Sequence, residues 1–241
     1  MGSLSRKAIK IYRYHGFSDL VFRGLRFLVS RILCAVFSLP SRKIGVYNGV
    51  AVRKEVLLRP DDVHTNYEKA LVSQIRRTVE SGEQIVVIGG GNGVSTTVAA
   101  RRAGKSGHVI SFEGSETRVE IARETTVLNK VSDRVTVNHA VVSNAQQLFS
   151  KAGAASQIEP GALPECDVLV MDCEGAELDI LRDISIRPRA IVVETHAYLD
   201  SPEQEVRKVL CEKDYSVRER GVEDKETGAY VLNALHMDSR K

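Results

Sequence analysis

Apolar residues form two kinds of pattern from about residue 84 onward. Uninterrupted apolar runs such as Ile85–Ile88 and Val168–Met171 indicate strands that are covered on both faces. Between these runs, apolar positions recur every three or four residues, which is typical of amphipathic helices. The alternation predicts an α/β domain with a mostly parallel sheet and helices on both faces.

The pattern gives approximate bounds for each element. The predicted strands are Gln84–Ile88, His108–Phe112, Arg134–His139, Asp167–Met171, Ala190–Glu194, Tyr215–Arg220 and Ala229–His236. The predicted helices are Tyr67–Glu80, Ser95–Ala103, Glu116–Asn129, Ala145–Lys151, Ala176–Asp183 and Pro202–Lys213, the last with Ser201 as its N-cap. Residues 151–165 are predicted to be a loop, and the short turn before Ala229 makes the last two strands antiparallel.

Two further elements precede this alternation. The apolar runs Ile44–Tyr47 and Val50–Leu58 flank Asn48 and Gly49, a pair that predicts a β-hairpin. Residues 1–43 contain many basic residues and a single acidic one, Asp19. We therefore expect an N-terminal segment over residues 1–43 and one domain over residues 44–241.

Residues 18–39 of the N-terminal segment have the periodicity of an amphipathic helix with a basic face. Three arginines, Arg23, Arg26 and Arg31, interrupt its apolar stretch and argue against a membrane-spanning helix. Two interpretations remain open. The helix lies in an anionic membrane interface as a peripheral contact, or it packs on the main domain as a lid or dimer element.

Composition excludes several classes of protein. The net charge of +3 comes from 34 basic and 31 acidic residues, which is too balanced for a dedicated nucleic-acid binder. Tryptophan is absent and aromatic residues make up 5%, so a base-stacking platform is not expected. The four cysteines form no Cys-x-x-Cys pair, which argues against a zinc site and for a reduced, cytoplasmic protein.

A glycine-rich turn follows the first strand of the alternation and leads into a helix. It reads Gly89-Gly90-Gly91-Asn92-Gly93 and is suited to bringing backbone N–H groups close to a ligand. The third glycine of a dinucleotide fingerprint is missing, because Val94 or Thr96 stands at that position. No Lys-Ser or Lys-Thr pair follows, so the turn is not a P-loop either.

Acidic and histidine side chains gather at the ends of the later strands. Glu113 ends the second strand at the distance from the glycine turn that suits hydrogen bonds with ribose hydroxyls. His139 ends the third strand, where the base of a cofactor would lie. The fourth strand leads into Asp172-Cys173-Glu174-Gly175-Ala176-Glu177, and the fifth leads into Glu194-Thr195-His196. Because parallel strands end at one edge of a sheet, these groups are expected near one ligand.

These stretches together resemble the FkbM family of S-adenosylmethionine-dependent methyltransferases. The resemblance covers about residues 68–200 and is carried by Val87–Gly93, Phe112–Ser115, Asp172–Glu177 and Val193–His196. It implies a Rossmann-like class I methyltransferase fold with a seven-stranded sheet in the order 3-2-1-4-5-7-6, its seventh strand antiparallel. It also implies S-adenosylmethionine as cofactor and O-methylation of sugars or natural-product hydroxyls or carboxylates.

The residues and the resemblance give one set of site predictions. The expected cofactor-binding residues are Gly89, Gly90, Gly91, Asn92, Gly93, Glu113, Gly114, His139, Ala140 and Asp172. The candidates for a general base are Asp172, Glu174, Glu194 and His196. The acids after the fourth strand could instead serve only as partners of a helix N-terminus, and His196 could be an ordinary buried or exposed histidine.

No metal is predicted, although Asp172, Glu194 and His196 together could hold a divalent ion that acidifies a hydroxyl. The sequence thus predicts an S-adenosylmethionine-dependent methyltransferase, O-directed, acting on a small or glycan-like acceptor. The alternatives are an NAD-dependent oxidoreductase and a catalytically inactive binding module held at a membrane by the N-terminal helix.

Overall fold

The computed structural model describes residues 42–56, 62–143 and 155–239, together with Val21, Leu25, Leu28, Val29, Ile32 and Val36. The chain divides into two compact units, one of Met1–Gly45 with Arg53–Val63 and one of Val46–Val52 with His64–Lys241. Within the described ranges, no helix is both long and apolar enough to cross a bilayer.

The described elements follow the predicted alternation. The strands are β1 (Arg42–Tyr47), β2 (Val50–Val56), β3 (Val63–His64), β4 (Gln84–Ile88), β5 (His108–Glu113), β6 (Val135–Val142), β7 (Ser156–Ile158), β8 (Val168–Met171), β9 (Ala190–His196), β10 (Tyr215–Asp224) and β11 (Ala229–His236). The α-helices are α2 (Lys69–Thr78), α3 (Val94–Ala103), α4 (Glu116–Leu128), α5 (Glu177–Asp183) and α6 (Glu203–Glu212).

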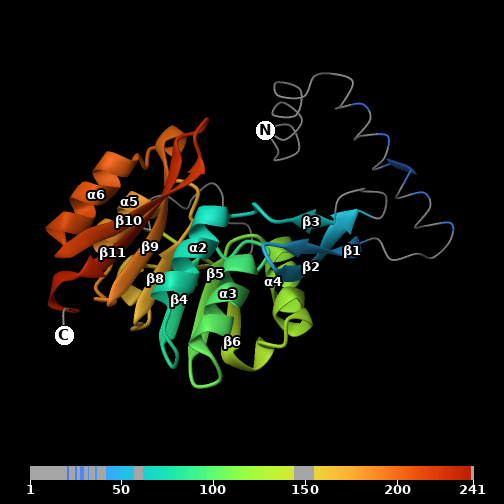
Figure 1. Cartoon of the computed structure of the whole chain (residues 1–241), viewed down its shortest axis with the longest axis horizontal. Helices are drawn as coiled ribbons and strands as arrows, with labels where there is room; N and C mark the ends of the chain where they lie inside the picture. The colour runs from blue at the N-terminus through green and yellow to red at the C-terminus, as the bar shows by residue number, and fades with distance from the viewer. Residues whose placement is uncertain are drawn as a thin grey trace. The chain divides into compact units, whose positions relative to one another are not determined.

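The main sheet has eight strands in the order β10-β11-β9-β8-β4-β5-β6-β7 (Figure 1). Strands β4, β5, β6, β7, β8 and β9 pair in parallel, whereas β11 is antiparallel to both of its neighbours. The prediction of seven strands was therefore wrong by one. The additional strand, β7, lies within the stretch predicted as a loop, and it is too short and too polar to stand out as a strand before it pairs with β6.

Alternate residues of the central strands pack on opposite faces of the sheet. Ile85 and Val87 of β4 belong to one apolar core together with residues of α2 and α3. Val86 and Ile88 belong to a second core together with residues of α5 and α6. This arrangement confirms that helices cover both faces, and it explains why the strands are apolar throughout.

The chain before the main sheet turns at Asn48 and Gly49. Both residues have positive φ, at 48° and 82°, as a type I′ turn between antiparallel strands requires. Strands β1 and β2 are hydrogen-bonded neighbours in a three-stranded sheet with β3, so the hairpin prediction is confirmed.

One local prediction was wrong, and two others lie wholly or mostly outside the described residues. Ser201 is not the N-cap of α6, because its hydroxyl donates to the carbonyl of Gly175 and Pro202 takes the cap position without a side-chain bond. The predicted helix Ala145–Lys151 lies outside the described residues. The predicted amphipathic helix over residues 18–39 also lies mostly outside them, although the six described residues there are helical.

Candidate functional site

A cavity of about 280 Å³ lies at the carboxyl ends of β4, β5, β6 and β8. Of the predicted site residues, it is lined by Gly89, Glu113, Gly114, Ala140, Asp172 and Glu174. Its other lining residues are Ile88, Phe112, Arg118, Val141, Val142, Ser143, Cys173 and Ala176. Gly90, Gly91, Asn92, Gly93, His139, Glu194 and His196 do not line it.

The glycine turn between β4 and α3 requires glycine for two physical reasons. Gly89, Gly91 and Gly93 have φ values of 82°, 55° and 84°, a region that favours residues without a Cβ. In addition, a Cβ on Gly89 would overlap the carbonyl oxygen of Asp172, and one on Gly93 would press on the backbone of Ala122. The turn is therefore set by close approach to β8 and α4 as well as by its own conformation.

The carboxylate of Glu113 connects this turn to the start of α4. Its Oε2 accepts a hydrogen bond from the backbone N–H of Gly91 at 2.8 Å, and its Oε1 accepts one from Ser115 at 2.8 Å. The side chain is buried, yet the residue lines the cavity. Glu113 thus presents a fixed carboxylate to the cavity, and it also holds the glycine turn in place.

Residues after β5 and within β6 form the next part of the wall. Gly114 and Ala140 line the cavity directly. His139 does not, and its Nε2 lies 3.2 Å from the carbonyl oxygen of Gly114. Gly114 and Ala140 therefore form part of the cavity wall, whereas His139 contacts the Gly114 carbonyl oxygen and does not line the cavity.

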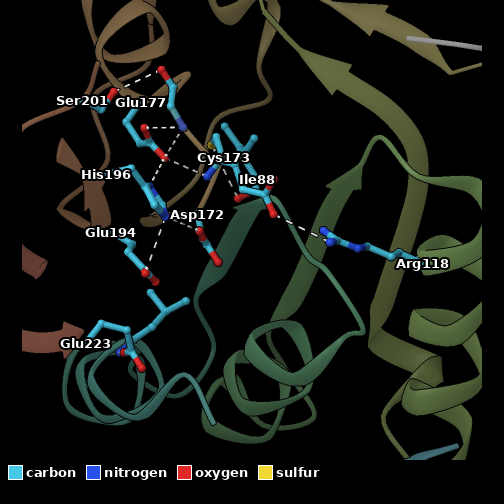
Figure 2. A network of polar contacts seen from close by, with 12 residues as sticks. Ile88, Arg118, Asp172, Cys173, Glu177, Glu194, His196, Ser201 and Glu223 are labelled. Carbon is cyan, nitrogen blue, oxygen red and sulfur yellow. Dashed lines mark hydrogen bonds and ion pairs between the residues drawn. The ribbon is translucent and has the colours of Figure 1, made fainter. Parts of the chain in front are cut away.

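Three of the four predicted catalytic residues meet beside the cavity (Figure 2). The Nε2 atom of His196 lies 3.5 Å from Oδ1 of Asp172 and 3.6 Å from Oε1 of Glu194. Asp172 follows the end of β8, and the other two residues belong to the end of β9. Asp172 also lines the cavity, so it connects this cluster to the cavity.

The fourth candidate, Glu174, stands apart from this cluster. It has a φ of 50°, is exposed, and its carboxylate lies 3.7 Å from the guanidinium of Arg118. Arg118 belongs to α4, so the Glu174 side chain points toward that helix. Arg118 lines the cavity as well and was not among the sequence candidates.

Glu177 is the important residue that sequence reasoning did not single out. Its Oε1 lies 2.9 Å from Nδ1 of His196, and its carboxylate accepts hydrogen bonds from the backbone N–H groups of Cys173 and Gly175 (Figure 2). The side chain is fully buried. It appeared in the sequence only as the last acid of the Asp172–Glu177 stretch, where its role could not be separated from that of a helix-start acid.

Burial and mutual repulsion shift the pKa values of this cluster. Burial raises the pKa of Asp172 to about 6, although the nearby His196 opposes the shift. Burial and the charge of Asp172 raise the pKa of Glu194 to about 9. Burial would lower the pKa of His196, but the hydrogen bond with Glu177 and the negative charges of Glu177, Asp172 and Glu174 together outweigh this effect and raise it. These shifts favour the protonated forms of Asp172, Glu194 and His196.

Two half-buried side chains, Tyr67 and Cys173, complete the surroundings. The hydroxyl of Tyr67 lies 3.4 Å from Nδ2 of Asn92 in the glycine turn, and burial raises its pKa strongly. Burial also raises the pKa of the Cys173 thiol well above its usual value. A protonated thiol is a weak nucleophile, so Cys173 is not suited to covalent catalysis.

Comparison with known proteins agrees with these features. A model of the methyltransferase FkbM domain matches residues 155–217, which include Asp172, Glu177, Glu194 and His196. A search of curated proteins gives no match.

Solved structures of low sequence identity share the fold. A SAM-dependent O-methyltransferase from Thermotoga maritima matches with a TM-score of 0.50 and 19% identity, over 85% of this chain and 81% of the other. A ribosomal protein L11 methylase from Lactobacillus delbrueckii subsp. bulgaricus matches with a TM-score of 0.52 and 12% identity, over 76% and 90%.

These likenesses support the Rossmann-like methyltransferase fold predicted from the sequence. The family match includes the acidic stretch and the end of β9, which carry the cluster around His196. Residues 155–217 thus match the domain of the family that the sequence motifs resemble, the FkbM methyltransferases.

Proposed function

We propose that this protein transfers a methyl group from S-adenosylmethionine to an oxygen atom of a small or glycan-like acceptor. The observation that carries the proposal is the Glu113 carboxylate, fixed by the N–H groups of Gly91 and Ser115 at the wall of the cavity. A fixed acid at this place beside a glycine turn suits the two hydroxyls of a ribose. The family match and the fold agree with this function.

The residues present fit the cofactor. The glycine turn admits no side chain at Gly89 or Gly93, and the cavity wall from Phe112 to Gly114 and from Ala140 to Ser143 offers apolar surface for a base. When bound, S-adenosylmethionine supplies the methyl group as a sulfonium, whose departure leaves a neutral thioether. We assign the glycine turn, Glu113, Gly114, His139, Ala140 and Asp172 to the cofactor-binding region.

The cluster of Asp172, Glu194 and His196 supports methyl transfer to oxygen. A hydroxyl must lose its proton before or during the transfer, and a group that takes or displaces this proton contributes about 10²–10⁴-fold in rate. Asp172 reaches the cavity and contacts His196, so we propose that the acceptor oxygen is activated here. Glu174 also lines the cavity but pairs with Arg118 rather than with His196, so we place it at the cavity wall rather than in this cluster.

A thermal unfolding assay on the full chain tests the choice of cofactor. S-adenosylhomocysteine at a hundredfold excess over its Kd should stabilise the protein by about 2.7 kcal/mol, and NAD should have no effect. Stabilisation by NAD alone would favour the oxidoreductase instead. Incubation with a labelled methyl donor and pooled hydroxyl compounds separates an active enzyme from an inactive binding module, since only the enzyme transfers label.

We also propose that the N-terminal segment contacts an anionic membrane surface. The six described residues within 18–39 are apolar and exposed: Val21, Leu25, Leu28, Val29, Ile32 and Val36. Basic residues lie between these apolar residues in the sequence, and this composition suits a helix lying among anionic headgroups. A cytoplasmic location, favoured by the scattered cysteines, remains part of this proposal.

Liposome flotation of the full chain tests the membrane contact. Binding should require anionic lipid and should weaken with added salt. The double variant Leu25→Gln with Leu28→Gln should lose binding, whereas Val127→Gln, which changes an exposed apolar residue of α4, should retain it. Failure to bind anionic vesicles would favour the alternative of a lid or dimer element.

A further inference from the structure

One exposed aromatic ring lies directly beside the cluster of Asp172, Glu194 and His196. Among the aromatic side chains that the structure describes, only Tyr198 is exposed, at 60%. It belongs to the short 3₁₀ turn Ala197–Leu199 that follows β9. Its ring stands nearly perpendicular to the imidazole of His196, with the ring centroids 5.9 Å apart. Single exposed apolar side chains are common on protein surfaces, but this one borders the place where we propose that the acceptor is activated.

The turn that carries Tyr198 is held in place by its own backbone and by a neighbouring loop. The N–H of His196 donates to the carbonyl of Ser201 at 2.8 Å, and the N–H of Ser201 donates back to the carbonyl of His196 at 3.1 Å. The Ser201 hydroxyl also donates to the carbonyl of Gly175. Leu199 packs so closely on Gly175 that a Cβ there would lie 2.6 Å from the Leu199 carbonyl oxygen. The Tyr198 ring is therefore presented to solvent on a fixed backbone.

The hydroxyl of Tyr198 lies within the influence of both the cavity wall and the cluster. Partial burial, followed by the negative charges of Glu174 and Glu194, raises the pKa of Tyr198, so the phenol stays protonated and can donate a hydrogen bond. Glu174 lines the cavity, whereas Glu194 lies 3.6 Å from His196 in the cluster. A molecule that rests on the Tyr198 ring is thus close to the groups that would act on its hydroxyls.

We propose that Tyr198 is a stacking platform for a sugar ring of the methyl acceptor, which makes the acceptor a glycan or a glycoside. A tyrosine ring offers a large flat contact surface at a low cost in conformational entropy, because only two side-chain torsions are fixed on binding. Its apolar face and polar tip suit a ligand that is apolar on one side and hydroxylated at its edge. Tyr198 acts by binding and orienting the acceptor and takes no part in the transfer itself.

Two requirements on the acceptor favour a sugar over other hydroxyl compounds. The acceptor must have a flat apolar face to cover the Tyr198 ring, and it must have hydroxyls at its edge to meet the carboxyl groups of Asp172 and Glu194. A pyranose ring has both, because C–H groups form one face and hydroxyls surround the rim. An acyclic polyol has no flat face, and a phenol has a single hydroxyl. Methylation of the sugar rests on the proposed function, whereas its binding by Tyr198 does not.

Saturation-transfer nuclear magnetic resonance on the full chain tests the platform. The probes are a panel of methyl pyranosides of the common hexoses and deoxyhexoses in both anomers, with glucitol and phenol as comparisons. We expect at least one pyranoside to bind, with transfer concentrated on the C–H groups of one ring face. Tyr198→Phe should retain binding, whereas Tyr198→Leu, which keeps apolar bulk without a flat ring, should weaken it at least about threefold. Val127→Ala, at an exposed apolar position of α4, is the control and should bind like the wild type.

Three results would overturn the proposal. They are the absence of binding by every pyranoside of the panel, undiminished binding by Tyr198→Leu, and Tyr198-dependent binding of phenol alone, which would indicate an aromatic acceptor instead. Circular dichroism establishes that each variant is folded, and Tyr198→Ala replaces Tyr198→Leu if the latter is not. Thermal unfolding with S-adenosylhomocysteine on the same samples separates the two proposals. A wild type that binds a pyranoside but not S-adenosylhomocysteine contradicts the proposed function alone, and the reverse result contradicts the platform alone.

Discussion

Gly89 and Asp172 approach so closely that a Cβ on Gly89 would overlap the carbonyl oxygen of Asp172. The two residues follow the paired strands β4 and β8, which run parallel at the centre of the sheet. The contact joins the glycine turn to the start of the acidic cluster. The cofactor region and the proposed reaction centre are therefore held together by backbone, without an intervening side chain.

Substitution of Gly89 by alanine should therefore be far more damaging than substitution of Gly91. Gly91→Ala meets only ordinary contact, at 3.9 Å from the carbonyl oxygen of Gly89, and should cost about 1–2 kcal/mol for its left-handed backbone. Gly89→Ala adds a clash with backbone and should cost about 4 kcal/mol or more. Urea unfolding of the two apo variants measures the difference. Equal costs would show that the approach to Asp172 is easily relieved.

Glu113→Gln should weaken S-adenosylhomocysteine binding by about 1.5–3 kcal/mol. The amide keeps the shape of the side chain, but its NH₂ group must face the N–H of Gly91 or of Ser115, both of which need an acceptor. We also expect some loss of folding stability, since the residue holds the glycine turn. Calorimetry measures the affinity. Glu116→Gln, at an exposed position of α4, is the control, and an equal affinity of the two variants would contradict the assignment.

Glu223→Ala should destabilise the fold by about 1–2 kcal/mol without affecting the cavity. The N-cap residue of α2, Glu68, makes no side-chain cap, and the carboxylate of Glu223 from β10 accepts hydrogen bonds from Lys69, Ala70 and Leu71 instead. Thermal or urea unfolding measures the loss. Glu226→Ala, an exposed position in the turn after β10, should change stability little; a comparable loss there would refute the capping role.

The stability contributed by Glu203 should disappear in acid. Burial would raise the pKa of this carboxyl, but hydrogen bonds from Arg207 and Arg220 outweigh it and hold the pKa below its usual value. A lowered pKa in the folded state stabilises the protein above the unfolded pKa of about 4.3, and the effect is lost as the pH falls through the folded value.

The difference in unfolding free energy between wild type and Glu203→Gln should consequently be largest near neutral pH and shrink below about pH 4.3. Urea unfolding at several pH values measures this difference. Glu205→Gln, in the same helical turn but exposed, should show no such pH dependence. A difference for Glu203→Gln that stays constant down to low pH would contradict the shifted pKa.

The sequence alone was sufficient to predict the features that depend on residues adjacent in the chain. The apolar runs of β4 and β8, the turn at Asn48 and Gly49, and the glycine turn before α3 each carry a local requirement for a strand, a positive φ or a close approach. Because parallel strands end at the same edge of a sheet, the acids at their carboxyl ends were then predicted to lie close together. Asp172, Glu194 and His196 do meet, as predicted.

Only the tertiary structure decided which side of the chain each acid faces. Glu174 and Glu177 are both acids of one short stretch, yet a φ of 50° turns Glu174 to Arg118, while the first turn of α5 places Glu177 on His196. Arg118 and His196 are remote in sequence from the acids that they contact, and the direction of each acidic side chain depends on single backbone angles. A pattern of residue types specifies neither the partner nor the angle. The short strand β7 was missed for the same reason, since its three residues become a strand only by pairing with β6.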